Sequence, residues 1–459
     1  MKFFRQRSSA SLSEQQKKSL GPFNGTDYKT IDSIDETVKK LRQALNKSEI
    51  LDKNNEQFND INNKQLITND VNDISSSSSS SSGHYSKTLT QTIKYVPNNV
   101  TNAEIIVNEN NMRICLENLR QNIILHKLYF DSIAKNDKHN EDNNCGTSSS
   151  SSSNNNNVSH KENSDNSMQT KANSDDTHNT KVIKTLCEEL FASHILLELI
   201  LKLSQIGFEN RKLTASVICN ALLLQTENRY LTVEYICTEP EIIYSLIDIY
   251  KYGRSDVTFN SGLILRQCLQ HQCLAKIVFN WKRFDEFFTF VNQKTFDVAM
   301  DAFITLRTLL TEHKQLTDDY MTQNGVKFFQ NYIQLINSDN YVTKRQSLEI
   351  LAIILSQSVI ICKLFALNTT YMAIIYKLLW HKYRHIRFRA LNIFHVFINN
   401  ESQLSIDVMD FILSQSDRDK LLEMLNHFKN YKTKCKYFLA LKPFAGKLIQ
   451  FFNTSTDET

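Results

Sequence analysis

Two groups of side chains have types and spacings that could bind a metal ion. His381 and His385 stand four residues apart, so on one helix they would share a face. Cys268, His271 and Cys273 form a second, tighter group. A zinc site needs three or four such ligands, and a catalytic zinc works beside a carboxylate base. No further Cys/His cluster completes either group, so we expect no metal and no cofactor, with the two histidines on the surface and Cys268 on a buried helical face.

The glycines exclude the loops that hold nucleotide phosphates. The sequence contains no G-x-G pair and no G-x-x-x-x-G-K stretch, so a dinucleotide fingerprint, a kinase glycine loop and a P-loop are all absent. A G-x-S-x-G elbow and an EF-hand ligand pattern are absent too. We therefore expect no catalytic residues and a protein that is not an enzyme. Catalysis by residues scattered along the chain is the remaining alternative.

Glycine and proline are scarce, which favours helices joined by short polar turns. The 459 residues include nine Gly and four Pro, whereas proteins usually contain roughly 7% and 5% of each. Glycine supplies the tight turns, and proline the loop and edge positions, of β-sandwiches, β-barrels and doubly wound α/β folds. From residue 181 to about 452, apolar residues recur every three or four positions, as expected for an all-α fold. Helices are expected to end at Gly207, Gly253 and Gly325.

A small residue followed by a large apolar one recurs along this region. The four pairs are Gly262-Leu263, Ala302-Phe303, Ser347-Leu348 and Ala390-Leu391, at steps of 40, 45 and 43 residues. This period is typical of armadillo or HEAT units of two or three helices. Such units stack into a solenoid in which each unit buries a face on its neighbour. The sequence therefore predicts a crescent-shaped helical-repeat solenoid with an extended concave surface.

Composition divides the chain into one folded domain and several disordered segments. Residues 52–92 contain eight consecutive serines, and residues 135–180 contain runs of Ser and Asn, with few apolar residues in either. Such segments bury too little surface to offset the entropy of ordering, so both are predicted to be disordered inserts. The predicted organisation is a disordered tail over 1–30, a single armadillo-like domain over 31–452, and a tail over 453–459.

Three features predict a cytoplasmic protein. The nine cysteines form no C-x-x-C pair and are typical of a reducing compartment. The basic N-terminus lacks the apolar core of a secretory signal. The most apolar stretch, 348–367, contains several polar residues, so it is interpreted as buried helix rather than a membrane span.

Positive charge is concentrated toward the C-terminus. Residues 363–447 carry 14 Lys/Arg and 6 Asp/Glu, a net +8, whereas the whole chain is +4. Lys382, Arg384 and Arg387 stand there beside Trp380 and Tyr383, a mixture typical of protein interfaces. The same mixture could hold single-stranded nucleic acid, or the cations could form a solvated helix face. An acidic peptide or protein is the partner we expect, and not nucleic acid.

A second candidate surface lies one and two repeats earlier. Tyr341 and Arg345 are four residues apart at the start of the apolar stretch, so they share a helical face. Phe296 occupies the position of Tyr341 one repeat before, and equivalent positions of a solenoid line one surface. The three residues either form an aromatic and cationic strip or place their rings in the core.

Several long motifs resemble one known family. They are VEYICT (233–238), GLILRQCLQHQCLAK (262–276), TFDVAMDAFITLRTLLTEHK (295–314), NYVTKRQSL (340–348) and, more weakly, HIRFRALNIFHV (385–396). The chain is similar over residues 181–428 to the calcium-binding protein 39 family, also called the Mo25 family, which includes fungal Hym-type proteins. The resemblance implies a non-catalytic armadillo-like scaffold. Calcium binding is not expected.

The resemblance also implies a function and contact residues. Family members bind and allosterically activate protein kinases or pseudokinases of the sterile-twenty and germinal-centre group. The concave kinase-contact positions correspond to Phe296, Tyr341 and Arg345. A pocket for a short peptide tail of the partner corresponds to Tyr376, Leu379 and Lys420, while Tyr376 and Ser416 stand where animal members have Met and Lys, which leaves the preferred tail motif open.

The implied setting is a network for cell polarity, morphogenesis and cell separation. The partner is a sterile-twenty-type kinase, and in fungal relatives a complex with a nuclear-Dbf-related kinase. A monomer within a heteromeric complex is expected, in the cytoplasm and at sites of polarised growth or division. The alternative is a general peptide-binding adaptor of the importin or catenin kind.

Overall fold

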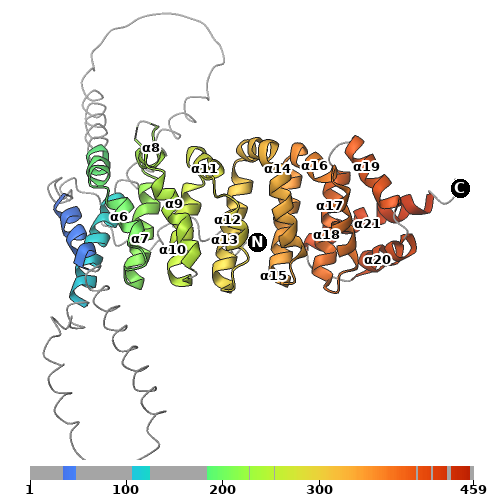
Figure 1. Ribbon diagram of the computed structural model, residues 1–459, viewed down its shortest axis with the longest axis horizontal. Coiled ribbons are helices and arrows are strands. Elements are labelled where there is room, and N and C mark those ends of the chain that lie inside the picture. The colour runs from blue at the N-terminus through green and yellow to red at the C-terminus, as the bar shows by residue number, and fades with distance from the viewer. Residues whose placement is uncertain are drawn as a thin grey trace, which may run out of the picture.

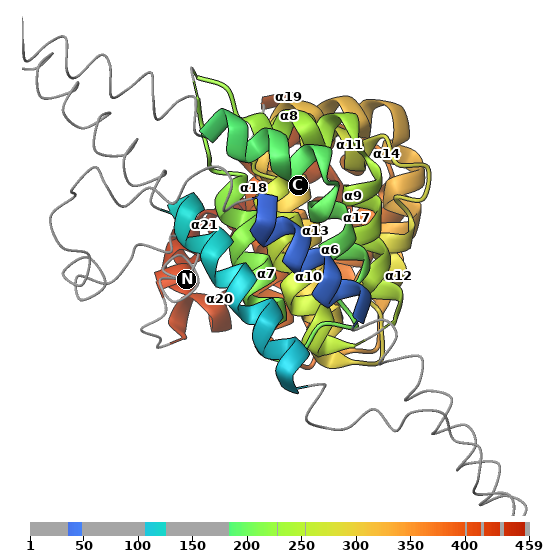
Figure 2. The same cartoon turned by 90° about the vertical axis from the view of Figure 1, so that its left-hand side faces the viewer.

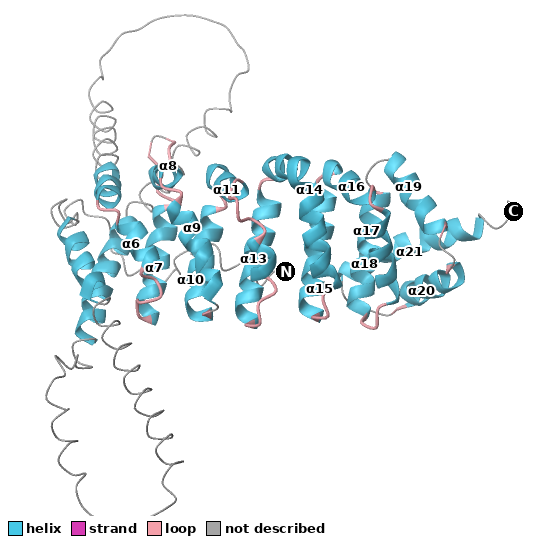
Figure 3. Cartoon of the chain, in the orientation of Figure 1, coloured by secondary structure: helices cyan, strands magenta, loops and turns pink. Residues whose placement is uncertain are grey.

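A computed structural model describes most of the predicted domain. The described residues are 35–47, 106–124, 183–226, 228–252, 254–399, 402–414, 417–431 and 436–454. The predicted disordered segments 1–30, 52–92 and 135–180 lie outside them. Every regular element of the described residues is a helix, and their one β-bridge joins Thr226 to Arg229 (Figure 3). The prediction of an all-α fold is confirmed.

Five long helices form a row along the molecule, which we call the long-helix row. Each packs against the next, and Figure 1 shows them side by side along the long axis. They are α7 (Phe208–Ala221), α10 (Ser255–Cys268), α13 (Phe296–Glu312), α15 (Tyr341–Gln357) and α18 (Arg384–Ile398).

The remaining helices pack behind the row or at its ends. Those between the long helices are α8 (Leu231–Thr238), α9 (Glu241–Asp248), η2 (Ile249–Tyr252), α11 (Gln272–Phe279), α12 (Glu286–Phe290), α14 (Lys314–Asn337), α16 (Val359–Ala366), α17 (Thr369–Lys377) and η3 (Leu378–Trp380). Those at the C-terminal end are α19 (Ser402–Leu413), α20 (Arg418–Asn430) and α21 (Lys436–Thr454). At the other end lie helices over 35–47, 106–124 and 183–192, followed by α6 (Ile195–Leu201).

The buried apolar residues form two adjoining layers, as the armadillo-like solenoid predicts. Helix α7 contributes to both of them, with Ile218 in the large layer and Val217 in the N-terminal one. Helix α6 does the same through Leu196 and Leu199. Figure 2 shows the helices over 35–47 and 106–124 lying across that end of the stack. Helices α6 and α7 are therefore buried on both sides, which is how layers of a solenoid without a central core become stable.

Small residues recur where the long helices meet. Seven residues after their N-caps, α10, α13, α15 and α18 carry Ser261, Ala302, Ser347 and Ala390, all fully buried. Small side chains let two helix backbones approach closely, so these positions set the spacing of the row. The predicted pair Gly262-Leu263 lies one residue too far along the chain to match the other three pairs. Leu263 is 47% exposed, whereas its supposed equivalent Phe303 is buried, because Ser261 rather than Gly262 holds the small position.

Gly262 lies beside a buried polar network that leaves no room for a side chain at this position. A Cβ at this position would lie 2.0 Å from Asp301 Oδ2 and 2.6 Å from the Tyr250 hydroxyl. The Tyr250 hydroxyl donates to Asp301 Oδ2 at 2.6 Å, and Arg266 Nη1 donates to the same oxygen at 2.9 Å. Burial and the Asp301 carboxylate raise the pKa of Tyr250 well above its usual value, so the phenol stays a donor. The network ties η2 and α10 to α13.

Two expectations for helix boundaries are wrong. Gly325 does not end a helix but lies inside α14, where a Cβ would come within 3.1 Å of Leu364 Cδ1 on α16. The apolar stretch 348–367 is divided at Ser358, whose hydroxyl oxygen caps α16 by accepting a hydrogen bond from the Ile361 amide at 3.2 Å. Among the described residues, no single helix has the length and hydropathy to cross a membrane; α16 with α17–η3, bent by 88°, meets that test only as a pair.

Replacing Gly262 with alanine is expected to destabilise the protein by about 1–3 kcal/mol, because the new methyl group overpacks the Tyr250–Asp301 contact. Urea unfolding followed by circular dichroism measures this. Gly446→Ala is the matched control, since that glycine also lies within a helix but a Cβ there meets only Lys429 Cε at 4.0 Å. The control is expected to be neutral or to stabilise by up to about 1 kcal/mol. Equal stability of Gly262→Ala and wild type would contradict this account of the network.

Candidate functional site

The predicted concave-face residues lie at the start of two neighbouring long helices. Phe296 and Tyr341 are the first residues of α13 and α15, and Arg345 follows Tyr341 by one turn. The Phe296 ring is 59% exposed and Arg345 is exposed, while Tyr341 is half-buried against the ring of Tyr383, with centroids 4.9 Å apart. The alternative that both rings belong to the core is therefore wrong for Phe296, because a ring at the very start of the helix extends past its packed neighbours.

The structure adds apolar residues that the sequence did not single out. Phe208, the first residue of α7, is 53% exposed, and Lys212 lies 4.1 Å from its ring centroid. This pair repeats the four-residue spacing of Tyr341 and Arg345. Further exposed side chains lie one, five or nine residues after the N-cap of a helix in the long-helix row. These positions are four residues apart, so they share one face of the helix. We call this set the strip: Phe208, Phe259, Leu263, Phe296, Ile304, Tyr341 and Arg345.

A side-chain cap holds the first turn of α15 in place. Asn340 Oδ1 accepts hydrogen bonds from the amides of Val342 at 2.9 Å and Thr343 at 3.3 Å. These amides have no partner within the helix, so the cap satisfies donors that are otherwise left to solvent. The cap fixes the backbone that carries Tyr341 and Arg345, which orients the two side chains before any partner arrives.

Charge changes sign along the row. Helices α7, α10 and α13 begin with an acidic residue in the first turn, namely Glu209, Asp256 and Asp297. Helices α15 and α18 have none there. Lys344 lies in the first turn of α15 with Arg345 directly after it, and Arg384 and Arg387 lie in the first turn of α18. The positive end of the helix dipole disfavours a cation by about 0.3–1 kcal/mol, so these side chains lie where they reduce helix stability.

His381 and His385 lie among these cations, whose positive charge adds to burial in lowering the pKa of both side chains. The pKa of His381 is lowered by burial and then by Lys344, Lys382 and Arg387. Burial also lowers the pKa of His385, together with Arg384, Arg345 and Arg389. The two histidines do not share one helix, because His381 lies before α18 and its Nδ1 accepts a hydrogen bond from the Tyr383 amide at 3.2 Å.

The predicted tail-pocket residues lie close together near the C-terminal end, with unequal exposure. Tyr376 and Leu379 are buried, and the Tyr376 ring packs edge-on against Trp380 at 4.8 Å. Lys420 is exposed and pairs with Asp417 at 3.3 Å. Burial, and then the same Asp417 carboxylate, raise the pKa of Tyr376 to about 12. Asp417 therefore links the aromatic group to the exposed lysine, while Ser416 lies outside the described residues.

The predicted thiol and histidine group does not converge on one point. Cys268 is fully buried in the core, where burial raises the pKa of its thiol and leaves it unreactive. His271 and Cys273 instead line an open hollow of about 460 Å³ beside the start of α8, together with Tyr230 and His313. Within the part of the chain that the structure describes, no three His, Cys, Asp or Glu side chains come together as a metal site.

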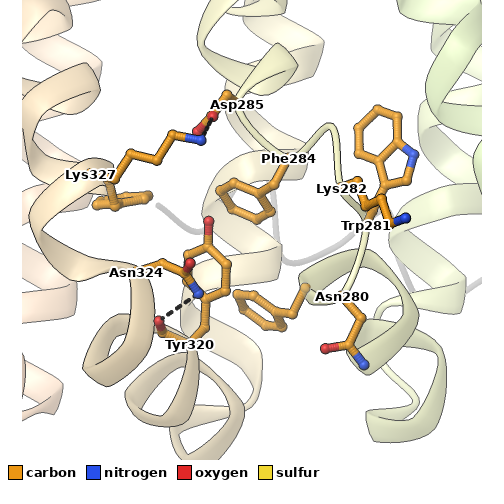
Figure 4. A pocket seen from close by; sticks show the side chains of 10 residues that line it. Asn280, Trp281, Lys282, Phe284, Asp285, Tyr320, Asn324 and Lys327 are labelled. Atoms are coloured by element: carbon orange, nitrogen blue, oxygen red, sulfur yellow. Dashed lines mark hydrogen bonds and ion pairs between the residues drawn. The ribbon is translucent and has the colours of Figure 1, made fainter.

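A smaller cavity of about 270 Å³ lies between the α11–α12 connection and α14, outside the long-helix row. Figure 4 shows the Tyr320 ring beside Phe284, at a centroid distance of 4.6 Å, with Trp281 on the opposite side. An ion pair between Lys327 and Asp285 lies above these rings. The aromatic walls pack α14 against the α11–α12 connection, while Asn280 and Lys282 are exposed at the cavity.

A stack of helical repeats that presents an aromatic, aliphatic and cationic strip defines a class of protein that binds other proteins. Comparison of the sequence with known families agrees with this class. The profile described as Mo25-like matches residues 133–450. The chain belongs to the Mo25 family, as its motifs predicted. Members of this family are scaffold proteins rather than enzymes, and the same holds for this chain.

Named relatives include animal and fungal proteins. A human protein named calcium-binding protein 39-like is 34% identical over 277 residues, which covers 59% of this chain and 80% of the relative. A Schizosaccharomyces pombe Mo25-like protein is 30% identical over 273 residues, covering 59% of this chain and 81% of the relative. Protein HYM1 of Saccharomyces cerevisiae is 24% identical over 262 residues, covering 55% of this chain and 64% of the relative.

Removal of the cap on α15 tests how the strip is held. Asn340→Ala is expected to cost about 1 kcal/mol and to speed hydrogen exchange at the Val342 and Thr343 amides, whereas Asn340→Ser should keep both near wild type. Hydrogen exchange measured by NMR, with urea unfolding, checks both effects. Asn368→Ala is the control, because Asn368 caps α17 in the same way. It should leave exchange at the two α15 amides unchanged. Unchanged exchange at both α15 amides in Asn340→Ala would show that the cap does not hold this turn.

Proposed function

We propose that this scaffold binds and allosterically activates a protein kinase or pseudokinase of the sterile-twenty and germinal-centre group. The observation that carries the proposal is the strip, in which Phe296 and Arg345 are exposed at the start of packed helices. Membership of the Mo25 family supports a scaffold role. Aromatic and arginine side chains on a preformed surface are the usual hot spots of protein interfaces.

The strip suits an activator because its own geometry is rigid. Its helices are held by fully buried neighbours such as Ala302 and Ser347, so little order has to be gained on binding. A rigid surface that contacts the active arrangement of a kinase better than the inactive one shifts the kinase population toward activity. The free-energy difference between the inactive and active arrangements then shifts by the difference in the binding free energy of the scaffold for the two.

Tyr376, Leu379 and Lys420 are proposed to form the second contact, with a short tail of the partner. The Lys420 ammonium is exposed and can pair with an acidic side chain or a terminal carboxylate. Tyr376 and Leu379 are buried, so they would support the pocket from below rather than line its rim. A tail held at this end and a kinase lobe held at the strip would together increase avidity.

The cellular setting is proposed by family resemblance alone. We propose a cytoplasmic protein that acts at sites of polarised growth or division, in a network for cell polarity, morphogenesis and cell separation. A complex with a nuclear-Dbf-related kinase is the proposed partner within this network. An importin- or catenin-like adaptor is less favoured, because such a groove presents ladders of asparagine, whereas the strip holds aromatic, aliphatic and cationic side chains.

Kinase activity with and without the purified chain tests the proposal. A purified sterile-twenty-type kinase acting on a generic protein substrate is expected to become faster when the chain is added. Phe296→Ala and Arg345→Ala should each reduce this activation by about tenfold or more, the usual effect of removing a hot-spot side chain. Both side chains are exposed, so the melting temperature is expected to stay near that of wild type.

Leu367→Ala is the matched control for these variants. Leu367 is 81% exposed but lies at the end of α16, outside the strip, so its truncation should leave activation intact. Activation that is equal in wild type, Phe296→Ala and Arg345→Ala would refute the strip as the kinase contact. Failure of the wild-type chain to activate any kinase of this group would refute the proposed function itself.

A further inference from the structure

Five cations gather where α15 and α18 begin, and we call them the basic cluster: Lys344, Arg345, Lys382, Arg384 and Arg387. Two of them come from α15 and three from α18 and the turn before it. None of the five forms an ion pair within 4.0 Å with a carboxylate of the described residues, whereas their neighbour Arg389 pairs with Glu349 at 2.8 Å. The cluster therefore carries more positive charge than its surroundings neutralise.

The contacts that these cations do make leave their charge uncompensated. Arg387 Nη1 donates to the carbonyl oxygen of His381 at 3.0 Å, and Lys382 lies 5.1 Å from the ring centroid of Tyr383. Arg384 donates to the hydroxyl of Tyr431. These partners orient the side chains, but none of them is an anion. The lowered pKa values of His381 and His385 agree with a shared positive field from both helices.

Helix stability does not explain the cluster. Cations in the first turn of a helix oppose its dipole, and the three preceding long helices carry Glu209, Asp256 and Asp297 at that place. Helices α15 and α18 have no acidic residue there and carry Lys344 and Arg387 instead. The first-turn cation of α7, Arg211, is by contrast paired with Asp256 at 2.7 Å. Cations without a carboxylate partner at two adjacent helix starts are the arrangement that an anion bound from outside would require.

We propose that the basic cluster binds a phosphorylated serine or threonine segment of a partner protein. The proposal rests on the proposed function, because Tyr341 and Arg345 belong to the strip as well, and it names the chemistry of the partner there. A phosphate monoester places nearly two negative charges and three acceptor oxygens at one point. The guanidinium forks of Arg345, Arg384 and Arg387 pair with such oxygens two at a time.

Two neighbouring tyrosines, Tyr341 and Tyr383, form an aromatic surface beside the cations, which we call the floor of the site. Tyr341 and Tyr383 pack edge-on at 4.9 Å, and the Tyr383 ring is 45% exposed among the cations. A peptide can place an apolar side chain on this floor while its phosphate reaches the arginines. A bare inorganic ion would leave the floor unused, so the geometry favours a peptide.

The extent of the cluster argues against nucleic acid. A strand of DNA or RNA needs a track of cations that follows its backbone. Along the row, however, the cations at the starts of α7 and α10 are already paired with carboxylates: Lys212 with Glu209 at 3.1 Å, and Arg211 and Arg254 with Asp256 at 2.7 and 3.2 Å. The charge is concentrated at one place, as a single phosphorylated site requires.

An immobilised degenerate peptide library with a central phosphothreonine or phosphoserine is a suitable probe. The full-length chain is expected to be retained by the phosphorylated library and to be released by phenyl phosphate. Retention should be weaker by about tenfold or more on the same library without phosphate, or with two aspartates in its place. A single-stranded oligonucleotide is the third comparison and should retain little protein.

A combined variant, Lys344→Gln with Lys382→Gln and Arg387→Gln, is expected to lose phosphopeptide binding by about tenfold or more. Its melting temperature should stay near that of wild type, because the removal of cations from helix starts offsets the loss of the hydrogen bond from Arg387 to the His381 carbonyl. Lys276→Gln with Lys282→Gln and Lys294→Gln removes the same net charge from exposed positions outside the cluster and should retain binding. Phe296→Ala should also retain phosphopeptide binding while it loses kinase activation, which separates this proposal from the proposed function.

Several outcomes would overturn the phosphopeptide site. Equal retention by the phosphorylated and aspartate libraries would show a site for acidic peptides in general. Preferential retention by the oligonucleotide would show a nucleic-acid site. Retention by neither, or unchanged binding in the combined variant, would show that the cluster is a solvated surface even if kinase activation holds.

Discussion

The close approach of successive long helices is the constraint on which the rest of the structure depends. It is possible because Ser261, Ala302, Ser347 and Ala390 are fully buried at one and the same position of four helices. A larger side chain at any of these points would push two layers apart and shift every later helix. Since the contact fixes the register of the row, residues at equal distances from the N-caps come to lie along one surface. The strip is a consequence of this packing.

Polar interactions in this molecule divide into those that join layers and those that face a partner. The joining ones are buried and satisfied, such as Tyr250 and Arg266 on Asp301, or the amide of Gly207 donating to Glu109 at 3.0 Å. Some of those facing outward pair with each other, as Lys420 does with Asp417, and others, such as Arg345, face solvent. Buried polar groups must be paired because desolvation is costly. Exposed cations near solvent bear little such penalty, so they are free to serve recognition.

Two halves of the row therefore offer different chemistry to one partner. The first half presents apolar groups such as Phe259 and Leu263, with acidic first turns beside them. The second half presents tyrosines amid cations. A kinase lobe that lies across both halves would bury apolar surface at one end and pair charges at the other. Apolar burial supplies most of the affinity of such contacts, and charge complementarity supplies orientation and specificity.

The sequence by itself determined the all-α class, the repeat of about 40 residues and the one-turn spacing of Tyr341 and Arg345, because helical periodicity and glycine scarcity are local properties of the chain. It also made Phe296 equivalent to Tyr341, since solenoid repeats are equivalent by construction, but the exposure of the Phe296 ring came from the structure. Only the tertiary structure decided which neighbour of each small residue is buried. Gly262 misled the repeat register because its size serves the Tyr250–Asp301 network, a contact between residues distant in sequence. The exposure of Phe208, the burial of Tyr376 and the gathering of Lys344 with Arg387 likewise depend on packing between layers, which no local pattern encodes.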